Sequence, residues 1–359
     1  MSSLRILYVG PDYPGSNGTC WRNAFLELGH EVSTIDSARL VSGPKIFTAK
    51  IYWKLSKRPP LNIIRLLNHA VIQEVRRFKP NFTIYMKADY ILPETLMETR
   101  KFAPNLAYMN DDMFNPRNQS FTFAEAIKLL DLILTTKSYN VPEFHRAGAS
   151  LALYIPNAYD PKIHFPAKPS TAEEPYYKGD VAFIGTFRPE RADFLARVAA
   201  YNGGFKLNVW GGGWDKMKRP VYWHKQLAWR KLSNCLRGKE LWCADMGKAF
   251  QSNKISLGLL YHANRDLHTS RSLEIPACGG FMLAERTDEH RQLFEEDKES
   301  VYFGTFEEML DKIRYYVAHD GERRRIAAAG YQRCLSSPYR YVDRARFAIQ
   351  LFHQLHLQH

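Results

Sequence analysis

The sequence lacks the cysteine spacing of a disulfide-stabilised or zinc-binding protein. Its five cysteines form an odd set without a Cys-x-x-Cys pair, which indicates reduced thiols buried as small apolar side chains. No apolar run approaches the roughly 18 residues of a membrane span, and the run at residues 6–10 is too short for a signal peptide. Internal repeats and low-complexity tracts are missing as well. We therefore expect a globular protein of the cytoplasm.

Acidic residues are also few: 37 Asp and Glu stand against 50 Lys and Arg, a formal net charge of +13. Such a balance predicts an anionic partner, which can be a nucleic acid, an acidic membrane or a phosphorylated small molecule. Residues 44–79 hold nine basic residues against one acid, and residues 214–242 hold eight together with four tryptophans. Each stretch is either a membrane or nucleic-acid surface or a solvated helix face above buried aromatic rings.

What the sequence does contain is an alternation of short apolar runs with helix-length segments over 359 residues. This pattern predicts two α/β domains with parallel sheets, because parallel strands need helical crossovers. Ligands of such sheets bind at the carboxyl ends of the strands. We expect strands at residues 6–9, 31–35, 82–86, 106–109, 129–135 and 151–155, and then at 181–184, 205–210, 255–260, 281–283 and 300–303.

The polar, proline-bracketed segment 166–175 is the best linker candidate. It predicts a first domain over residues 1–167 and a second over 168–335. Residues 336–359 would form a C-terminal helix that crosses back to the first domain.

Several segments are similar to one enzyme family. YIPNAYDPKIHF (154–165) and DLILTTKSYNVPEFHRAG (131–148) resemble the end of the first domain of group 1 GT-B glycosyltransferases. From residue 179 to 335, GDVAFIGTFRPER, SLEIPACGGFMLAE and EEDKESVYFGTF resemble the CgeB-like (spore maturation protein type) branch. The resemblance implies a GT-B fold, in which two Rossmann-like domains face each other across a cleft. The first domain would bind the acceptor and the second a nucleotide-sugar.

The resemblance implies a set of donor-binding residues in the second domain. Glu274 would accept hydrogen bonds from the ribose hydroxyls, and the alternative is an exposed acid that complements a helix dipole. Arg188 and Arg191 would neutralise the diphosphate, unless they are ordinary surface arginines. The remaining donor candidates lie in glycine turns and in the loop before Glu274: Gly185, Gly211, Gly212, His262, Ser270 and Arg271.

Four acids are catalytic candidates. Asp266 lies eight residues before Glu274, where the family has an acid near the transferred sugar, although it can equally be a loop residue or a helix cap. Asp111 and Asp112 follow an expected strand at the place of a family histidine. They could act as a base, a sugar ligand or a cap. Asp12, after the first strand, is either a base or a turn residue.

The sequence thus predicts a metal-independent glycosyltransferase without a bound cofactor, which uses a UDP- or GDP-sugar. Retention at the anomeric carbon is favoured over an inverting route that uses Asp12, Asp111 or Asp112. The acceptor would be a glycan, a lipid-linked or a small molecule, in polysaccharide, glycolipid or other glycoconjugate synthesis. Residues 44–79 would hold the enzyme on the inner face of the membrane. The rivals are a GT-B nucleotide-sugar epimerase, a module that binds without turnover, and a basic nucleic-acid-binding protein, with nucleic acid disfavoured.

Overall fold

The computed structural model describes residues 3–42, 60–201, 203–238 and 240–356. The chain divides into two compact units, which are described separately: Met1–Asn157 with Tyr341–His359, and Ala158–Arg340. The expected linker 166–175 lies inside the second unit, and the last helix belongs to the first. No helix within the described ranges is both long and apolar enough to cross a bilayer.

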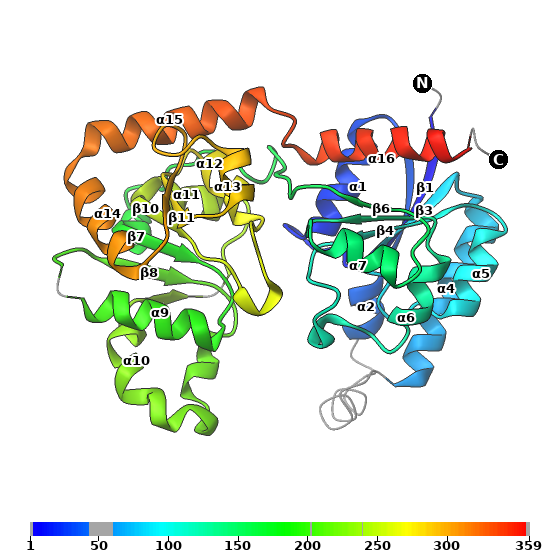
Figure 1. Cartoon of the computed structure of the whole chain (residues 1–359), viewed down its shortest axis with the longest axis horizontal. Helices are drawn as coiled ribbons and strands as arrows, with labels where there is room; N and C mark the ends of the chain where they lie inside the picture. The colour runs from blue at the N-terminus through cyan, green and yellow to red at the C-terminus, as the bar shows by residue number, and fades with distance from the viewer. Residues whose placement is uncertain (1–2, 43–59, 202, 239, 357–359) are drawn as a thin grey trace. The chain divides into compact units, whose positions relative to one another are not determined.

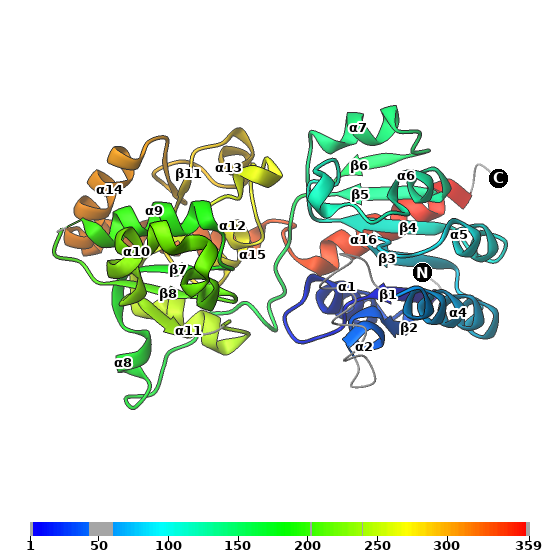
Figure 2. The ribbon, with the colours of Figure 1, turned by 90° about the horizontal axis from the view of Figure 1, so that it is seen from below.

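The first unit is a parallel sheet with the strand order β2-β1-β3-β4-β5-β6, flanked by helices (Figures 1 and 2). Its strands are β1 (Arg5–Gly10), β2 (Glu31–Asp36), β3 (Phe82–Met86), β4 (Asn105–Met109), β5 (Leu132–Thr135) and β6 (Ala152–Tyr154). Its helices are α1 (Asn17–Glu27), α2 (Ser37–Ser42), α4 (Leu61–Phe78), α5 (Pro93–Arg100), α6 (Phe123–Ala126), α7 (Asn140–Arg146) and α16 (Tyr341–His356).

Burial explains why the last helix folds onto this unit. Phe352 of α16 lies with its ring centroid 5.1 Å from Phe82 of β3, and Tyr341 lies 6.2 Å from Trp21 of α1. All four aromatic side chains are buried. Removal of so much apolar surface from water holds α16 against α1.

The second unit is another parallel sheet, with the order β12-β11-β10-β7-β8-β9. Its strands are β7 (Gly179–Ile184), β8 (Leu207–Trp210), β9 (Leu236–Gly238), β10 (Asn253–Gly258), β11 (Met282–Glu285) and β12 (Val301–Phe303). Its helices are α8 (Glu174–Tyr177), α9 (Pro189–Ala200), α10 (Gln226–Ser233), α11 (Ala244–Ser252), α12 (Arg271–Ala277), α13 (Asp288–Leu293), α14 (Phe306–Ala318) and α15 (Asp320–Ser336).

The prediction of an α/β protein with parallel sheets is confirmed. Every expected strand is present, and only β9 was missed. Three residues at the edge of a sheet leave no periodic pattern to recognise. The strand expected from residue 129 begins at Leu132 instead, because Ile127–Leu129 forms a short 3-10 helix.

Candidate functional site

The loops after β7 and β8 touch at the carboxyl edge of the second sheet. Gly211 has a φ of 140°, and a Cβ atom there would lie 2.0 Å from the carbonyl oxygen of Gly185. Only glycine permits this approach. The first residue of α12, Arg271, donates from Nε to the carbonyl of Ile184 at 3.0 Å. The structure therefore brings Gly185, Gly211 and Arg271 to one place, with Gly212 next along the loop.

The two predicted phosphate-binding arginines have different surroundings. Arg191 donates to the carbonyls of Thr186, Leu259 and Leu260 at 3.3–3.4 Å, so it fastens the loop after β7 to the end of β10. Arg188 is exposed, and its guanidinium lies 4.7 Å from the ring centroid of Tyr261. Arg188 is thus the cation that is available to an anionic ligand, whereas Arg191 shapes the loops.

Glu274 is buried, with 5% of its surface exposed, in the first turns of α12. One carboxylate oxygen forms an ion pair with Arg271, and the other lies 3.5 Å from Nε2 of His164. Burial and then the charge of Arg271 lower the pKa of His164 to about 3, so its ring is neutral. Nδ1 of His164 accepts the amide hydrogen of Asp160 at 3.0 Å, and the ring proton therefore sits on Nε2 and faces Glu274.

This geometry bears on the alternative interpretation of Glu274, that of an exposed acid beside a helix dipole, while its contact with a ribose stays a prediction. An acid that only complements a helix dipole would be solvated, whereas Glu274 is buried with its charge balanced. Sequence reasoning missed His164, although it lies in the quoted segment YIPNAYDPKIHF. The signal that could have identified His164 was its position as a polar residue within this motif.

Two carboxylates accept hydrogen bonds from the backbone of the loop after β10. Asp266 is buried, and its Oδ2 accepts the amide hydrogen of Tyr261 at 3.2 Å. Oε1 of Glu285, at the end of β11, accepts the amide hydrogen of Leu260 at 2.7 Å. Its Oε2 lies 2.6 Å from Nε2 of His262, whose side chain is largely exposed. The Tyr261 contact of Asp266 is that of a loop residue, its role near a transferred sugar stays a prediction, and Glu285 is a contributor that the sequence analysis did not single out.

A buried histidine joins this loop system to α12. Burial lowers the pKa of His290 to about 4, so the ring is neutral. Its Nδ1 lies 2.6 Å from the carbonyl oxygen of Glu285 and must carry the proton, because a carbonyl only accepts. Nε2 then accepts from the hydroxyl of Ser272 at 2.7 Å, and that oxygen accepts the amide hydrogen of Thr269 at 3.0 Å. The start of α12, next to Ser270, is thereby tied to the end of β11.

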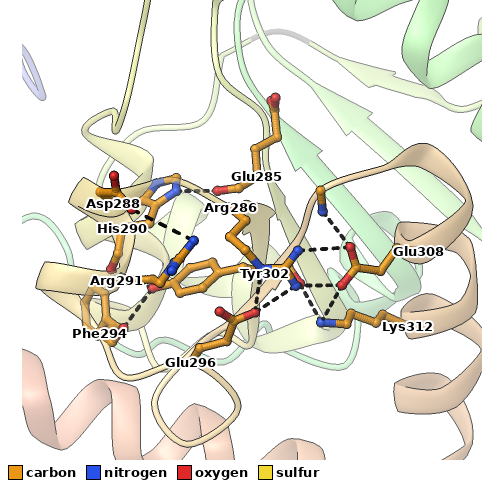
Figure 3. A network of polar contacts seen from close by, with 11 residues as sticks. Glu285, Arg286, Asp288, His290, Arg291, Phe294, Glu296, Tyr302, Glu308 and Lys312 are labelled. Atoms are coloured by element: carbon orange, nitrogen blue, oxygen red, sulfur yellow. Dashed lines mark hydrogen bonds and ion pairs between the residues drawn. The ribbon is translucent and has the colours of Figure 1, made fainter.

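A separate ion-pair network supports the same strand end (Figure 3). Arg286 donates to Glu296 at 2.9 Å and to both oxygens of Glu308 at 2.6 and 3.1 Å, and Lys312 lies 3.1 Å from Glu308. The hydrogen bonds from Arg286 are the main reason that the pKa of Glu308 falls to about 2. The network fixes the chain after β11, directly beyond the Glu285 contacts.

The three predicted acids of the first unit have unequal surroundings. Asp112 is buried, and its Oδ1 accepts from Asn140 at 3.0 Å and from the amide of Phe114 at 3.1 Å, which marks it as a loop cap. Asp12 accepts from Arg22 at 2.7 Å and from Thr19 at 2.9 Å. Asp111 pairs with Lys87, and both side chains stay partly exposed. Asp111 is therefore the acid of this set with the best access to a ligand.

The sequence analysis missed Asp89, whose carboxylate interacts electrostatically with Lys87. Both follow β3, next to β4 in the sheet, and three residues here have positive φ values of 55–64°: Lys87, Ala88 and Tyr90. Non-glycine residues adopt this conformation rarely, and it is concentrated at functional sites. Burial raises the pKa of Asp89 to about 6. The signal in the sequence was a lysine and an acid directly after an expected strand.

The described residues contain no group of three or more His, Cys, Asp and Glu that could hold a metal ion. Most of the predicted donor residues meet at one edge of the second sheet, together with Asp266, while the other three predicted acids lie at the carboxyl ends of β1 and β4 in the first sheet.

Comparisons with known proteins agree with this architecture. Residues 188–350 match the model of a family described as glycosyl transferase-like. The fold resembles that of HepE from Anabaena, solved with UDP-glucose, at 15% identity and a TM-score of 0.66, covering 97% of this chain and 99% of HepE. The fold also resembles that of sucrose-phosphate synthase from Thermosynechococcus elongatus, at 12% identity and a TM-score of 0.69, covering 99% of this chain and 100% of the synthase.

A glycosyltransferase from Rickettsia africae is similar as well, at 12% identity and a TM-score of 0.63, covering 99% of both chains. No curated protein matches the sequence. The chain has the GT-B fold of glycosyltransferases. Its second half, in addition, carries the sequence pattern of the glycosyl transferase-like family.

Proposed function

We propose that this protein transfers a sugar from a nucleotide-sugar donor to an acceptor. The observation that carries the proposal is the buried, charge-balanced Glu274 at the start of α12, beside the Gly185–Gly211 contact. The family match of residues 188–350 supports it. HepE, with the same fold, was solved with UDP-glucose, which favours a UDP-sugar as the donor. The order of motifs over 179–335 favours the CgeB-like branch.

In this proposal the second unit binds the donor. The ribose hydroxyls donate to Glu274. Because Gly211 and Gly212 have no side chains, the base or the ribose ring of the nucleotide can pack directly against their backbone. The diphosphate lies near Arg188 and the amide groups of Ser270 and Arg271 at the start of α12, because the next amides, from Ser272 onward, donate to carbonyls of the chain. As the bond from the sugar to the diphosphate breaks, negative charge grows on the leaving phosphate, and Arg188 with these amides stabilises it. No bound cofactor is needed for this chemistry.

The first unit supplies the acceptor site. Asp111, with Lys87 and Asp89 beside it, is the group that we assign to the acceptor or to the transferred sugar. Retention is favoured, as in the group 1 enzymes that the motifs resemble. An inverting reaction would instead need one of the acids as a base, and Asp111 is better placed than Asp12 or Asp112, whose oxygens are held by other side chains.

Replacement of Glu274 tests the donor site. The Glu274→Ala variant should bind UDP about 1–3 kcal/mol more weakly, because the buried ribose hydroxyls lose their charged partner. Glu274→Gln, which keeps the shape, should lose part of that affinity. Isothermal titration with UDP and UDP-glucose measures both. The control is Glu307→Ala, since this glutamate of the same unit is exposed. Unchanged affinity in a folded Glu274→Ala variant contradicts the assignment.

The reaction itself is tested by release of UDP from UDP-glucose with a panel of glycan, lipid-linked and small acceptors. Release that requires an acceptor supports transfer. Isomerised donor sugar without any acceptor identifies an epimerase, and binding without turnover identifies a binding module.

A further inference from the structure

One segment of the second unit has two faces of opposite character. Residues 214–231 form two short 3-10 helices, Trp214–Lys218 and Pro220–Lys225, followed by most of α10. On the inner side, Trp214, Met217 and Trp229 are buried in the core. On the outer side, Val221 is 66% exposed, Trp223 77% and Leu227 80%. We call this outer side the 214–231 face.

Packing holds this segment firmly on the rest of the unit. The indole nitrogen of Trp229 donates to Asp193 of α9 at 2.9 Å, and Lys225 forms an ion pair with the same carboxylate. Gln226 donates to the carbonyl of Met217 at 2.5 Å. The helix α10 accordingly lies beside α9 in Figures 1 and 2. The three apolar side chains are therefore presented by a fixed backbone.

The exposed apolar residues lie within seven positions, so they are neighbours on one surface rather than scattered singles, which need no explanation. Cations surround them. Residues 214–231 contain six Lys and Arg and one acid, Asp215. Lys218, Arg219, Arg230 and Lys231 are exposed. Leu227, Arg230 and Lys231 are spaced i, i+3 and i+4 in α10, which places them on one side of the helix.

We propose that the 214–231 face docks the protein on a bilayer that contains anionic lipid. An aromatic ring and aliphatic side chains between lysines and arginines match the boundary between headgroups and acyl chains, and the cations match the anionic headgroups. A second copy of this face would bring like charges together. A nucleic acid would stack on Trp223, but Val221 and Leu227 offer no ring to a base.

Every residue of the 214–231 face lies within the described ranges, whereas the 44–79 stretch lies partly outside them. Five of the nine basic residues of that stretch lie outside the described ranges: Lys45, Lys50, Lys54, Lys57 and Arg58. Of its later apolar run, Ile63, Ile64 and Leu67 are buried in the core of the first unit, whereas Leu61 and Leu66 are exposed. The 214–231 face is also independent of the proposed transfer reaction, since it includes no donor residue.

Vesicle sedimentation of the full chain tests the proposal. We expect binding to phosphatidylcholine vesicles with 30% phosphatidylglycerol, little binding to pure phosphatidylcholine, and loss at about 0.5 M salt, where screening is short-ranged. Substitution of Trp223→Ser with Leu227→Ser should weaken the partition at least about tenfold. Lys218→Glu with Arg219→Glu should do the same, since each cation near the surface contributes on the order of fivefold.

Matched controls come from exposed residues elsewhere in the second unit. Leu335→Ser, at a position 52% exposed, and Arg324→Glu with Arg325→Glu should bind vesicles like the parent. Thermal unfolding of each variant establishes that it is folded. Equal binding by the 214–231 variants would overturn the proposal, as would no binding to anionic vesicles by the parent.

Two further measurements test whether the 214–231 face binds a second copy of the protein or a nucleic acid instead of a membrane. Self-association by sedimentation velocity that Trp223→Ser with Leu227→Ser abolishes would make it an interface between copies. Binding of single-stranded DNA at physiological salt that needs Trp223 but not Leu227 would make it a nucleic-acid surface. Either result overturns membrane docking, and UDP titration of the same samples reports separately on the proposed function.

Discussion

The carboxylate of Glu274 shows how a single buried charge prepares a binding site. Burial of an ionised acid without a partner costs several kcal/mol, but the charge of Arg271 offsets that cost before any ligand binds. The neutral ring of His164 adds a proton donor without adding charge. In the proposed donor site, a ribose would therefore meet an oriented acceptor that has already been desolvated during folding.

Asp89 gives a prediction that depends on pH. Burial lifts its pKa from 3.8 to about 6. The folded pKa lies above the unfolded one, so the protonated form of Asp89 favours the folded state. Its contribution to the free energy of unfolding is fully present below about pH 4 and is lost as the pH rises through 6. Asp89→Asn stays neutral, so we expect it to be about 1–2 kcal/mol more stable than the parent at pH 8 and equal near pH 4.

Urea denaturation of parent and variant at pH 4, 6 and 8 measures this difference. Asp288→Asn is the control, because the Asp288 side chain is 91% exposed. A gain at pH 8 no larger than that of the control would show that Asp89 is not held in a desolvated position.

The type of a residue could be predicted from the sequence more readily than its partners. Glu274, Arg188 and the loop glycines Gly185, Gly211 and Gly212 were predicted as donor residues from short motifs. The sequence could not show that Asp112 caps a loop, because its partner Asn140 lies 28 residues away. Nor could it show that Arg191 donates to the carbonyls of Leu259 and Leu260, which follow β10. Such roles depend on contacts between distant segments.

At the scale of elements, the loop after β8 depends on the absence of a side chain at Gly211. In the Gly211→Ala variant the new methyl group would meet the carbonyl of Gly185, and the φ of 140° would be strained. We expect a loss of at least about 2 kcal/mol in the free energy of unfolding and weaker UDP binding. Chemical denaturation and titration measure the two effects.

Gly321→Ala is the matched control for this change. An added Cβ at Gly321 meets nothing within 4 Å, and alanine favours the helical conformation of α15. The control should be as stable as the parent or slightly more so. If Gly211→Ala unfolds like the control and binds UDP normally, the close contact of the two loops is not required.

The strands were the most predictable elements, and the reason is physical. Central strands of a parallel sheet are buried on both faces, so they appear as continuous apolar runs such as Val181–Ile184. The edge strand β9 has no such run. The exposed side chains of the 214–231 face were also not predictable, since Trp223 and Trp229 look alike in sequence, and only the fold buries one and exposes the other.

For the whole molecule, the net charge of +13 has two distinct uses in our proposals. A few arginines at the donor site would act on one diphosphate at short range. The cations of the 214–231 face would act together on an extended anionic surface. These two uses differ in salt dependence, because screening weakens a sum of exposed charges more than it weakens a partly buried contact.

Transfer by the whole protein should need no divalent metal. Charge on the leaving diphosphate would be met by Arg188 and by the amide groups that begin α12, and these donors are part of the chain. We expect UDP release with acceptor to continue at more than about half its rate in excess EDTA. The control adds magnesium beyond the EDTA, which should change little. Complete loss of activity in EDTA, restored by magnesium or manganese, would contradict the prediction and assign the neutralising charge to a metal ion instead.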